Sequence, residues 1–323
     1  MRDHAFDILK GILIVLVVMG HLVDSNTILH SIIFSFHMPV FFMITGMLSH
    51  WGARNKQFLI KRAKSYVVPY FSWCILLFLL FLIENPVKYI VRIVYGGAMN
   101  TTEYTYPFWF ICCLFVSSVV FNRFWTSKKW VLIFLSAYLL GWYLVFHKID
   151  IPALPWSIEV VPFAVLYFFW GIWTSSMERV AVQHYGASFY IIPVVIACVF
   201  IAAHIYGYTN FTITMKTLKF KCFYLDLIYP ATFYLALKGM CICISRSFYI
   251  AKALAYIGKS SLVIMFSHVA IGCVIYKIAP PTAVYGQTLT GVFIITLVSI
   301  VCGCSINALC SQNRLLSFVF LGK

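Results

Sequence analysis

The stretch DILKGILIVLVVMGH, residues 7–21, decides the fold of this chain, because it is an apolar run with polar groups only at or near its ends. On a helix, Lys10 and His21 would differ by only ~20° in direction and lie roughly 16 Å apart along the axis. Asp7, one turn before Lys10, would face nearly the same side. Such groups cost free energy in a bilayer unless they meet a cavity or a partner. The pattern therefore favours a functional stripe that faces inward, the alternative being headgroup-level positions for these residues.

The composition indicates a membrane protein throughout. The 323 residues are 63% hydrophobic and 10% charged, with a mean hydropathy of +0.93. Apolar runs of about twenty residues, the length that crosses ~30 Å of hydrocarbon, recur along the chain. We expect an all-α polytopic membrane protein with about ten transmembrane helices in one domain, residues 1–323. The expected spans are 6–24, 29–49, 66–84, 106–123, 130–147, 160–177, 187–207, 223–244, 257–278 and 284–310. The first has no small-residue cleavage site, so we do not expect a signal peptide.

The distribution of basic residues predicts an orientation. The net charge is +15, but the lysines and arginines gather in alternate short loops, so a nucleic-acid partner is not expected. Loops 50–65, 123–129 and 245–259 are basic, which places them and both termini in the cytoplasm by the positive-inside rule. Loop 208–222 carries three lysines on the opposite side and is the exception to this pattern.

The cysteines give no sign of a metal site. Eleven are scattered along the chain, and several fall inside apolar runs. None has the spacing of metal ligands, so we expect no metal and interpret them as small core residues. Those inside apolar runs include Cys112, Cys113, Cys241, Cys243, Cys302 and Cys304.

Two motifs in the first third of the chain are candidates for chemistry. FSFHMPVFFMITG, residues 34–46, puts His37 beside Pro39 in an apolar run. The proline should kink the helix and free a carbonyl group, and His37 is then either catalytic or a satisfied structural residue. Lys61, Arg62 and Lys64 precede the third span, either as a topology signal or as an anion site at its cytosolic mouth.

Later signals are sparser. Trp109 opens the fourth span and fits interface packing. Trp156 and Glu159 could form a sugar platform in an outer loop. His268 lies midway through its span and is a further candidate for a polar interior. Asp226 and Lys238 could form an intramembrane pair, although twelve residues separate them.

Most well-known catalytic motifs are missing from the sequence. It contains no P-loop, no dinucleotide-binding glycine pattern, no HExxH and no GxSxG. Histidines in the membrane and basic residues on the cytosolic side suit one reaction in particular. In it, a histidine base activates a hydroxyl group against an acyl donor that carries phosphates.

The order of the motifs resembles a known family. DILKG with His21 eleven residues after Lys10, FHMPVFFMITG, KR before Pro69–Tyr70, PFWF, WSIE, and IGKSSL before His268 cover nearly the whole chain. In this order they are similar to the acyltransferase-3 family of integral membrane O-acyltransferases, and within it to the fucose 4-O-acetylase-like branch. Many members have arginine where this chain has Lys10, which keeps the charge but lacks the bidentate fork. Some members carry a soluble hydrolase-like domain, which we do not expect here.

The resemblance implies an activity and its residues. Members of the family move acyl groups, commonly acetyl, from cytosolic acyl-CoA to extracytoplasmic glycans. We therefore expect an O-acetyltransferase of the bacterial inner (plasma) membrane that acts on a sugar hydroxyl of a surface or cell-wall glycan or its lipid-linked precursor. Acetyl-CoA would be a donor substrate, with no permanently bound cofactor, and the protein would also contact membrane lipids.

The expected roles are as follows. His21 would be the general base, with Lys10 and His37 as further catalytic residues. The residues expected to bind donor or acceptor are Asp7, Arg62, Trp109, Glu159 and His268. Two alternatives remain open: a transporter or flippase for a lipid-linked sugar or small anion, and acylation of a small molecule or lipid.

Overall fold

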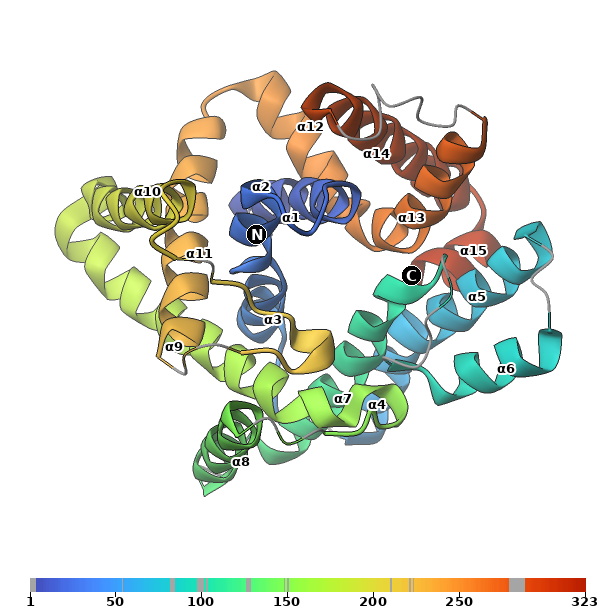
Figure 1. Cartoon of the computed structure of the whole chain (residues 1–323), viewed down its shortest axis with the longest axis horizontal. Coiled ribbons are helices and arrows are strands. Elements are labelled where there is room, and N and C mark those ends of the chain that lie inside the picture. The colour runs from blue at the N-terminus through green and yellow to red at the C-terminus, as the bar shows by residue number, and fades with distance from the viewer. Residues whose placement is uncertain are drawn as a thin grey trace. The chain divides into compact units, whose positions relative to one another are not determined.

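The computed structural model is all-helical (Figure 1). The structure describes residues 4–53, 55–81, 85–97, 102, 104–125, 129–147, 149, 151–209, 211–220, 222, 224–278 and 288–323. The helices are α1 His4–Leu22, α2 Ile28–Phe34, α3 His37–Leu48, α4 Asn55–Arg62, α5 Val68–Phe81, α6 Pro86–Tyr95, α7 Trp109–Phe124, α8 Lys129–Phe146, α9 Val161–Tyr185, α10 Ile191–Ile205, α11 Leu225–Ile244, α12 Phe248–Lys259, α13 Ser261–Ile278, α14 Leu289–Ser311 and α15 Arg314–Leu316.

The helices confirm a polytopic all-α membrane protein. In the described ranges, eight helical stretches are long and apolar enough to cross a membrane, and one of them, Pro155–Ile205, contains both α9 and α10. The fifth expected span corresponds to α8, which holds a shorter apolar stretch, Leu135–Leu144. Each of the ten expected spans thus has a helical counterpart. Parts of three expected spans, residues 82–84, 223 and 284–287, lie outside the described residues.

The second expected span is broken into two helices. α2 ends at Phe34 and α3 begins at His37, and Pro39 lies in the first turn of α3. A proline ring clashes with the carbonyl group four residues earlier, here that of Ser35. The expected kink is confirmed, and it places His37 at the start of a new helix.

The loop expected at 245–259 instead contains α12, which packs along α1. Glycines make this close approach possible. A Cβ atom on Gly11 would lie 2.1 Å from the carbonyl oxygen of Leu254, and one on Gly258 would lie 1.9 Å from that of Asp7. Small residues let membrane helices approach backbone to backbone in this way. Periodicity missed α12 because it is shorter than a membrane span.

The loop expected at 50–65 also contains helix. α4 leads into a π-helical segment, Ala63–Val67, and then into α5. α6 has ten residues, too few to cross the membrane. It buries Tyr89 and Ile93 and exposes four apolar side chains, those of Val87, Ile90, Val91 and Val94.

The chain forms two compact units, each built from three segments. Unit 1 comprises residues 1–49, 138–149 and 166–261, and unit 2 comprises residues 50–137, 150–165 and 262–323. In unit 1, α1 packs against α2, α3, α11 and α12. In unit 2, α7 packs against α4 and against the 3₁₀ segment Pro155–Val160. The single domain expected from the sequence stays a prediction.

The cysteines follow the expectation only in part. Cys112, Cys113 and Cys241 are buried, as core residues should be. Cys302 and Cys304 are partly buried. Cys243 is exposed, so its interpretation as a core residue was wrong: its position on α11 turns it away from the packed face.

Candidate active site

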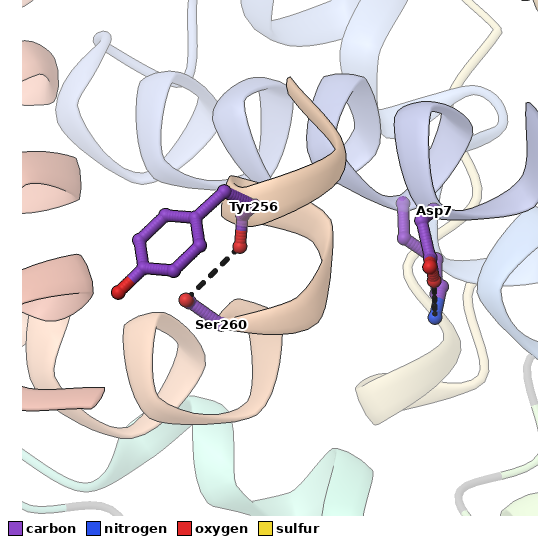
Figure 2. Close-up of polar contacts among 4 residues, drawn as sticks. Asp7, Tyr256 and Ser260 are labelled. Atoms are coloured by element: carbon purple, nitrogen blue, oxygen red, sulfur yellow. Dashed lines mark hydrogen bonds and ion pairs between the residues drawn. The ribbon is translucent and has the colours of Figure 1, made fainter. Parts of the chain in front are cut away.

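The first half of α1 holds an ion pair. Lys10 Nζ lies 2.9 Å from Asp7 Oδ1, one turn earlier on the same helix (Figure 2). Asp7 is almost fully buried, with 2% of its surface exposed. The shared face expected from their spacing is confirmed. The carboxylate compensates the ammonium charge, so Lys10 is not an isolated cation.

This half of α1 is held against the end of α12. The backbone of Asp7 meets Gly258. Figure 2 shows the last turn of α12 nearby, where the Ser260 hydroxyl donates to the carbonyl oxygen of Tyr256 over 3.0 Å. Ser260 is fully buried. Ser260 therefore completes the packing at the end of α12.

Three histidines of unit 1 surround one aromatic ring. The ring of Phe34, at the end of α2, contacts His21 edge-on at 5.9 Å between centroids. It stacks on His30 at 3.8 Å and meets His37 at 4.6 Å. His37 begins α3, three residues after Phe34, and meets the same ring as His21. Two of the expected catalytic residues are thus gathered at Phe34.

The tautomer of His37 is fixed by the backbone. Its Nδ1 lies 2.8 Å from the carbonyl oxygen of Ile33. A carbonyl group only accepts hydrogen bonds, so Nδ1 must carry the hydrogen. Nε2 of the neutral ring then keeps its lone pair, which is the state required of a general base.

A loop of unit 1 closes over the end of α2. The backbone N–H of Ile213 donates to the carbonyl oxygen of Phe34 over 2.9 Å. Nε2 of His204 lies 3.1 Å from the carbonyl oxygen of Phe211, which ties the same loop to α10. Phe211 and Ile213 are buried. The loop thereby holds the end of α2, which carries Phe34, in place.

Arg62, in unit 2, lies in an aromatic cage. Its guanidinium carbon is 4.9 Å from the ring centroid of Phe58, 5.6 Å from that of Tyr66 and 5.7 Å from that of Trp51. One guanidinium nitrogen donates to the Tyr66 hydroxyl over 3.0 Å. The cage fixes a planar cation beside a π-helical segment, a feature frequent at functional sites. Lys61, next to Arg62, is exposed.

Trp109 and His268 are buried in unit 2 and belong to different helices. Trp109 begins α7 and packs edge-on against Phe110. His268 lies in α13, where its Nδ1 is 2.9 Å from the carbonyl oxygen of Ile264. By the same reasoning as for His37, that nitrogen carries the hydrogen. The expected role of Trp109 in binding donor or acceptor stays a prediction.

The segment before α9 contains a strained turn in unit 2. Trp156 and Ser157 both have left-handed backbone angles, with φ of 57° and 56°. Each such non-glycine residue costs about 1–3 kcal/mol, and such strain gathers at functional sites. The Trp156 ring packs against Tyr70, Phe71 and Phe115, and its indole N–H donates to the carbonyl oxygen of Val94 over 3.1 Å. The Trp156 ring is half-buried among these side chains, and the sugar platform expected from the sequence stays a prediction.

Glu159 follows this turn. Its Oε2 accepts the backbone N–H of Leu154 over 3.0 Å. Among the residues that the structure describes, its buried Oε1 has no hydrogen-bond partner, and the same holds for the buried hydroxyl of Ser157. A buried polar atom without a partner calls for an explanation.

Sequence reasoning missed several polar contacts. Glu178, on α9, accepts hydrogen bonds from the hydroxyl groups of Tyr190 and Tyr234, and all three side chains are buried. Glu178 lies just beyond the expected span 160–177, beside Arg179, so its burial had no clear signal in the sequence. The role of Phe34 could not be predicted, because one phenylalanine in an apolar helix looks like any other core residue.

The Asp226–Lys238 pair expected from the sequence is not found. The two residues lie on one continuous helix, α11, about 18 Å apart along its axis. Lys238 Nζ instead lies 3.7 Å from the ring centroid of Phe6. Asp226 is fully buried, and its carbonyl oxygen accepts the Tyr167 hydroxyl over 2.9 Å.

The described side chains do not gather like metal ligands. Within the described ranges, no three or more His, Cys, Asp or Glu side chains come together in a group able to hold a metal ion.

Comparison with known proteins gives two curated relatives. Both are called nodulation protein NolL. The one from Mesorhizobium japonicum is 29% identical over 181 residues, which cover 52% of this chain and 47% of the relative. The one from Sinorhizobium fredii is 29% identical over 152 residues, which cover 41% and 40%. The chain thus matches less than half the length of each relative.

A family model covers far more of the chain. It describes an acyltransferase domain and matches residues 3–308. That range includes every residue singled out above, from the Asp7–Lys10 pair to His268. The chain belongs to the acyltransferase-3 family.

Proposed function

We propose that the protein is an O-acetyltransferase that moves an acetyl group from cytosolic acetyl-CoA to a sugar hydroxyl. The acceptor would be a surface or cell-wall glycan, or its lipid-linked precursor, at the bacterial plasma membrane. The proposal rests on the acyltransferase family and on the histidine cluster at Phe34. The observation that carries it is that His21 and a second histidine, His37, contact the same Phe34 ring, and that Nε2 of His37 is kept as a proton acceptor.

The chemistry needs only a base and a bound donor. As the acceptor oxygen attacks the thioester carbonyl carbon, a histidine Nε2 takes the hydroxyl proton. The carbon–sulfur bond then breaks, and the departing sulfur of coenzyme A receives that proton. Base assistance of this kind is worth about 10² to 10⁴ in rate. The transfer is balanced without a metal or a second cofactor.

Arg62 is the proposed contact for the phosphates of the donor. A guanidinium offers five N–H donors in a planar fork that matches phosphate oxygens. Its aromatic cage restrains the side chain before the donor arrives, which lowers the ordering cost of binding. The Asp7–Lys10 pair is the proposed support of α1 on the donor side.

The test is transfer of label. Membranes that contain the protein, incubated with radiolabelled acetyl-CoA, should incorporate label into a glycan or glycolipid fraction. His21→Gln, which keeps a polar side chain but cannot act as a base, should lower incorporation by at least 10². His184→Gln replaces an exposed histidine of α9 and serves as the matched control, with normal labelling. Absence of label with the unchanged protein would favour a transporter instead.

A further inference from the structure

The strained turn at Trp156 and Ser157 is clamped from one side by the end of α6. Val94 accepts the indole N–H of Trp156, and the Tyr95 hydroxyl donates to the carbonyl oxygen of Ala153 over 2.8 Å. Gly97 lies so close that a Cβ atom on it would be 2.5 Å from the backbone nitrogen of Ser157 and 2.8 Å from its hydroxyl oxygen. The surroundings therefore impose the left-handed backbone, which Ser157 would not adopt by itself.

The turn contains two buried polar atoms that have no hydrogen-bond partner among the described residues. The exposed fraction of Ser157 is 0%, and its hydroxyl group has no partner among the described residues. Glu159 is anchored through Oε2 on Leu154, while its Oε1, also without a partner in the described part of the chain, belongs to a partly exposed residue. One anchored carboxyl oxygen and one unused oxygen is the arrangement expected where a ligand supplies the missing hydrogen bond.

We propose that Ser157 and Glu159 form a subsite for the hydroxyl groups of a neutral sugar unit of the acceptor. The inference rests on the proposed function. A sugar hydroxyl would donate to Glu159 Oε1 after a small movement of that side chain, and the Ser157 hydroxyl would take part in the same network. A carboxylate here attracts hydroxyl donors and repels phosphates and carboxylates, so this part of the acceptor is uncharged.

Two substitutions separate binding from folding. Ser157→Gly removes the hydroxyl group and relieves the left-handed strain, so this variant should unfold at no lower temperature than the unchanged protein. Glu159→Gln keeps an oxygen for the N–H of Leu154 but weakens the unused position as an acceptor. Glu159→Gln should raise the KM for the acceptor by about tenfold to a hundredfold, the usual effect of losing a hydrogen bond to a charged group, and Ser157→Gly, which loses a neutral hydroxyl group, should raise it by about threefold to tenfold. Neither should change the KM for acetyl-CoA.

Glycines supply the matched control. Gly97→Ala should raise the acceptor KM at least as much, because its Cβ would displace Ser157. Gly186 has nearly the same φ, 61° against 60°, but no atom near its Cβ position. Gly186→Ala therefore carries the same backbone penalty and should leave the acceptor KM unchanged.

The assay uses the acceptor fraction that the unchanged protein labels with radioactive acetyl-CoA, isolated and titrated against each variant. Competition by methyl glycosides tests whether the subsite prefers a neutral sugar to a negatively charged one. The inhibition constant of a neutral hexose should be at least tenfold lower than that of a hexuronic acid. Glu159→Gln should reduce this difference between the two inhibition constants. Acceptor KM values within twofold of normal for Ser157→Gly and Glu159→Gln, or equal competition by the two glycosides, would overturn the subsite while the acetyltransferase proposal stands. If the unchanged protein labels nothing, both proposals fail together.

Discussion

At the scale of single residues, the hydrogen bond from the His37 ring to the backbone carbonyl group of Ile33 is the most informative detail. Because the carbonyl group of Ile33 holds the hydrogen on Nδ1, the ring cannot switch tautomer without losing a buried hydrogen bond. His21 and His37 both contact Phe34, so either nitrogen base can be the one that serves the reaction. Substitutions can decide between them.

We expect His37→Asn to fold normally, and its remaining activity decides whether His37 or His21 is the base. The asparagine amide nitrogen occupies nearly the position of Nδ1 and can still donate to Ile33, but nothing replaces Nε2. Labelling from acetyl-CoA should fall by about 10² to 10⁴ if His37 is the base, and much less if His21 is. His37→Ala is the comparison for folding, because it removes the side-chain donor to the carbonyl oxygen of Ile33, which keeps only backbone N–H groups such as that of Phe36 at 3.4 Å, and should lower the unfolding temperature.

Arg62 gives a second prediction at this scale. Arg62→Lys keeps the positive charge but cannot match the planar fork or stack equally well in its cage. We expect acetyl-CoA to bind about tenfold more weakly, as measured by titration of the purified protein. Lys61→Ala, a neighbouring exposed charge, should change donor affinity little. Equal donor affinity in Arg62→Lys and the unchanged protein would leave the basic cluster as a topology signal.

At the scale of elements, glycines decide how closely helices pack. Gly11 and Gly258 bring α1 and α12 into backbone contact. Within unit 1, Gly46 of α3 and Gly171 of α9 do the same, since Cβ atoms there would lie 2.3 Å and 2.4 Å from carbonyl oxygens of the opposite helix. Backbone cannot move aside as a side chain can. These positions therefore tolerate no larger residue.

We expect Gly258→Ala to destabilise the protein by about 1–3 kcal/mol, the usual cost of overpacking. The added methyl group would meet the carbonyl oxygen of Asp7 and push α12 away from α1. Thermal unfolding in detergent measures the effect. Gly20→Ala is the control, because its neighbours are the side-chain ends of Ile33 and Phe34 at 3.1 Å, which can shift. Equal unfolding temperatures for the two variants would contradict the close packing.

At the scale of the whole molecule, the orientation in the membrane remains a prediction from charge. Five basic residues and no acid lie in residues 50–65. One of them, Arg54, lies outside the described residues. Four more basic residues of the chain also lie outside them: Arg2, Lys128, Lys148 and Lys221. The structure adds that Arg62 is half-buried in its cage, so not all of this charge is a plain topology signal.

We expect reporter fusions at Lys56 and Lys323 to lie in the cytoplasm, because basic loops are retained on that side. A paired reporter, active only in the cytoplasm or only outside it, checks each position. A fusion within 208–222 should give the opposite result and serves as the control. An external Lys56 would reverse the orientation and separate Arg62 from cytosolic acetyl-CoA.

The sequence by itself determined the class of the protein, the presence of a helix at each of the ten expected spans, the kink at Pro39 and the shared face of Asp7 and Lys10. These follow from local physics: the length of apolar runs, the missing proline donor and the helical repeat. The motif order also led to the right family.

The tertiary structure decided the rest. The contact of His21 and His37 at Phe34, the cage of Arg62, the packing of α12 on α1 and the strained turn at Ser157 all join residues from separate elements. Such contacts depend on how helices pack against one another, and helical periodicity in the sequence does not predict this packing. A strained backbone is invisible to sequence patterns for the same reason, since it persists only where neighbouring residues impose it.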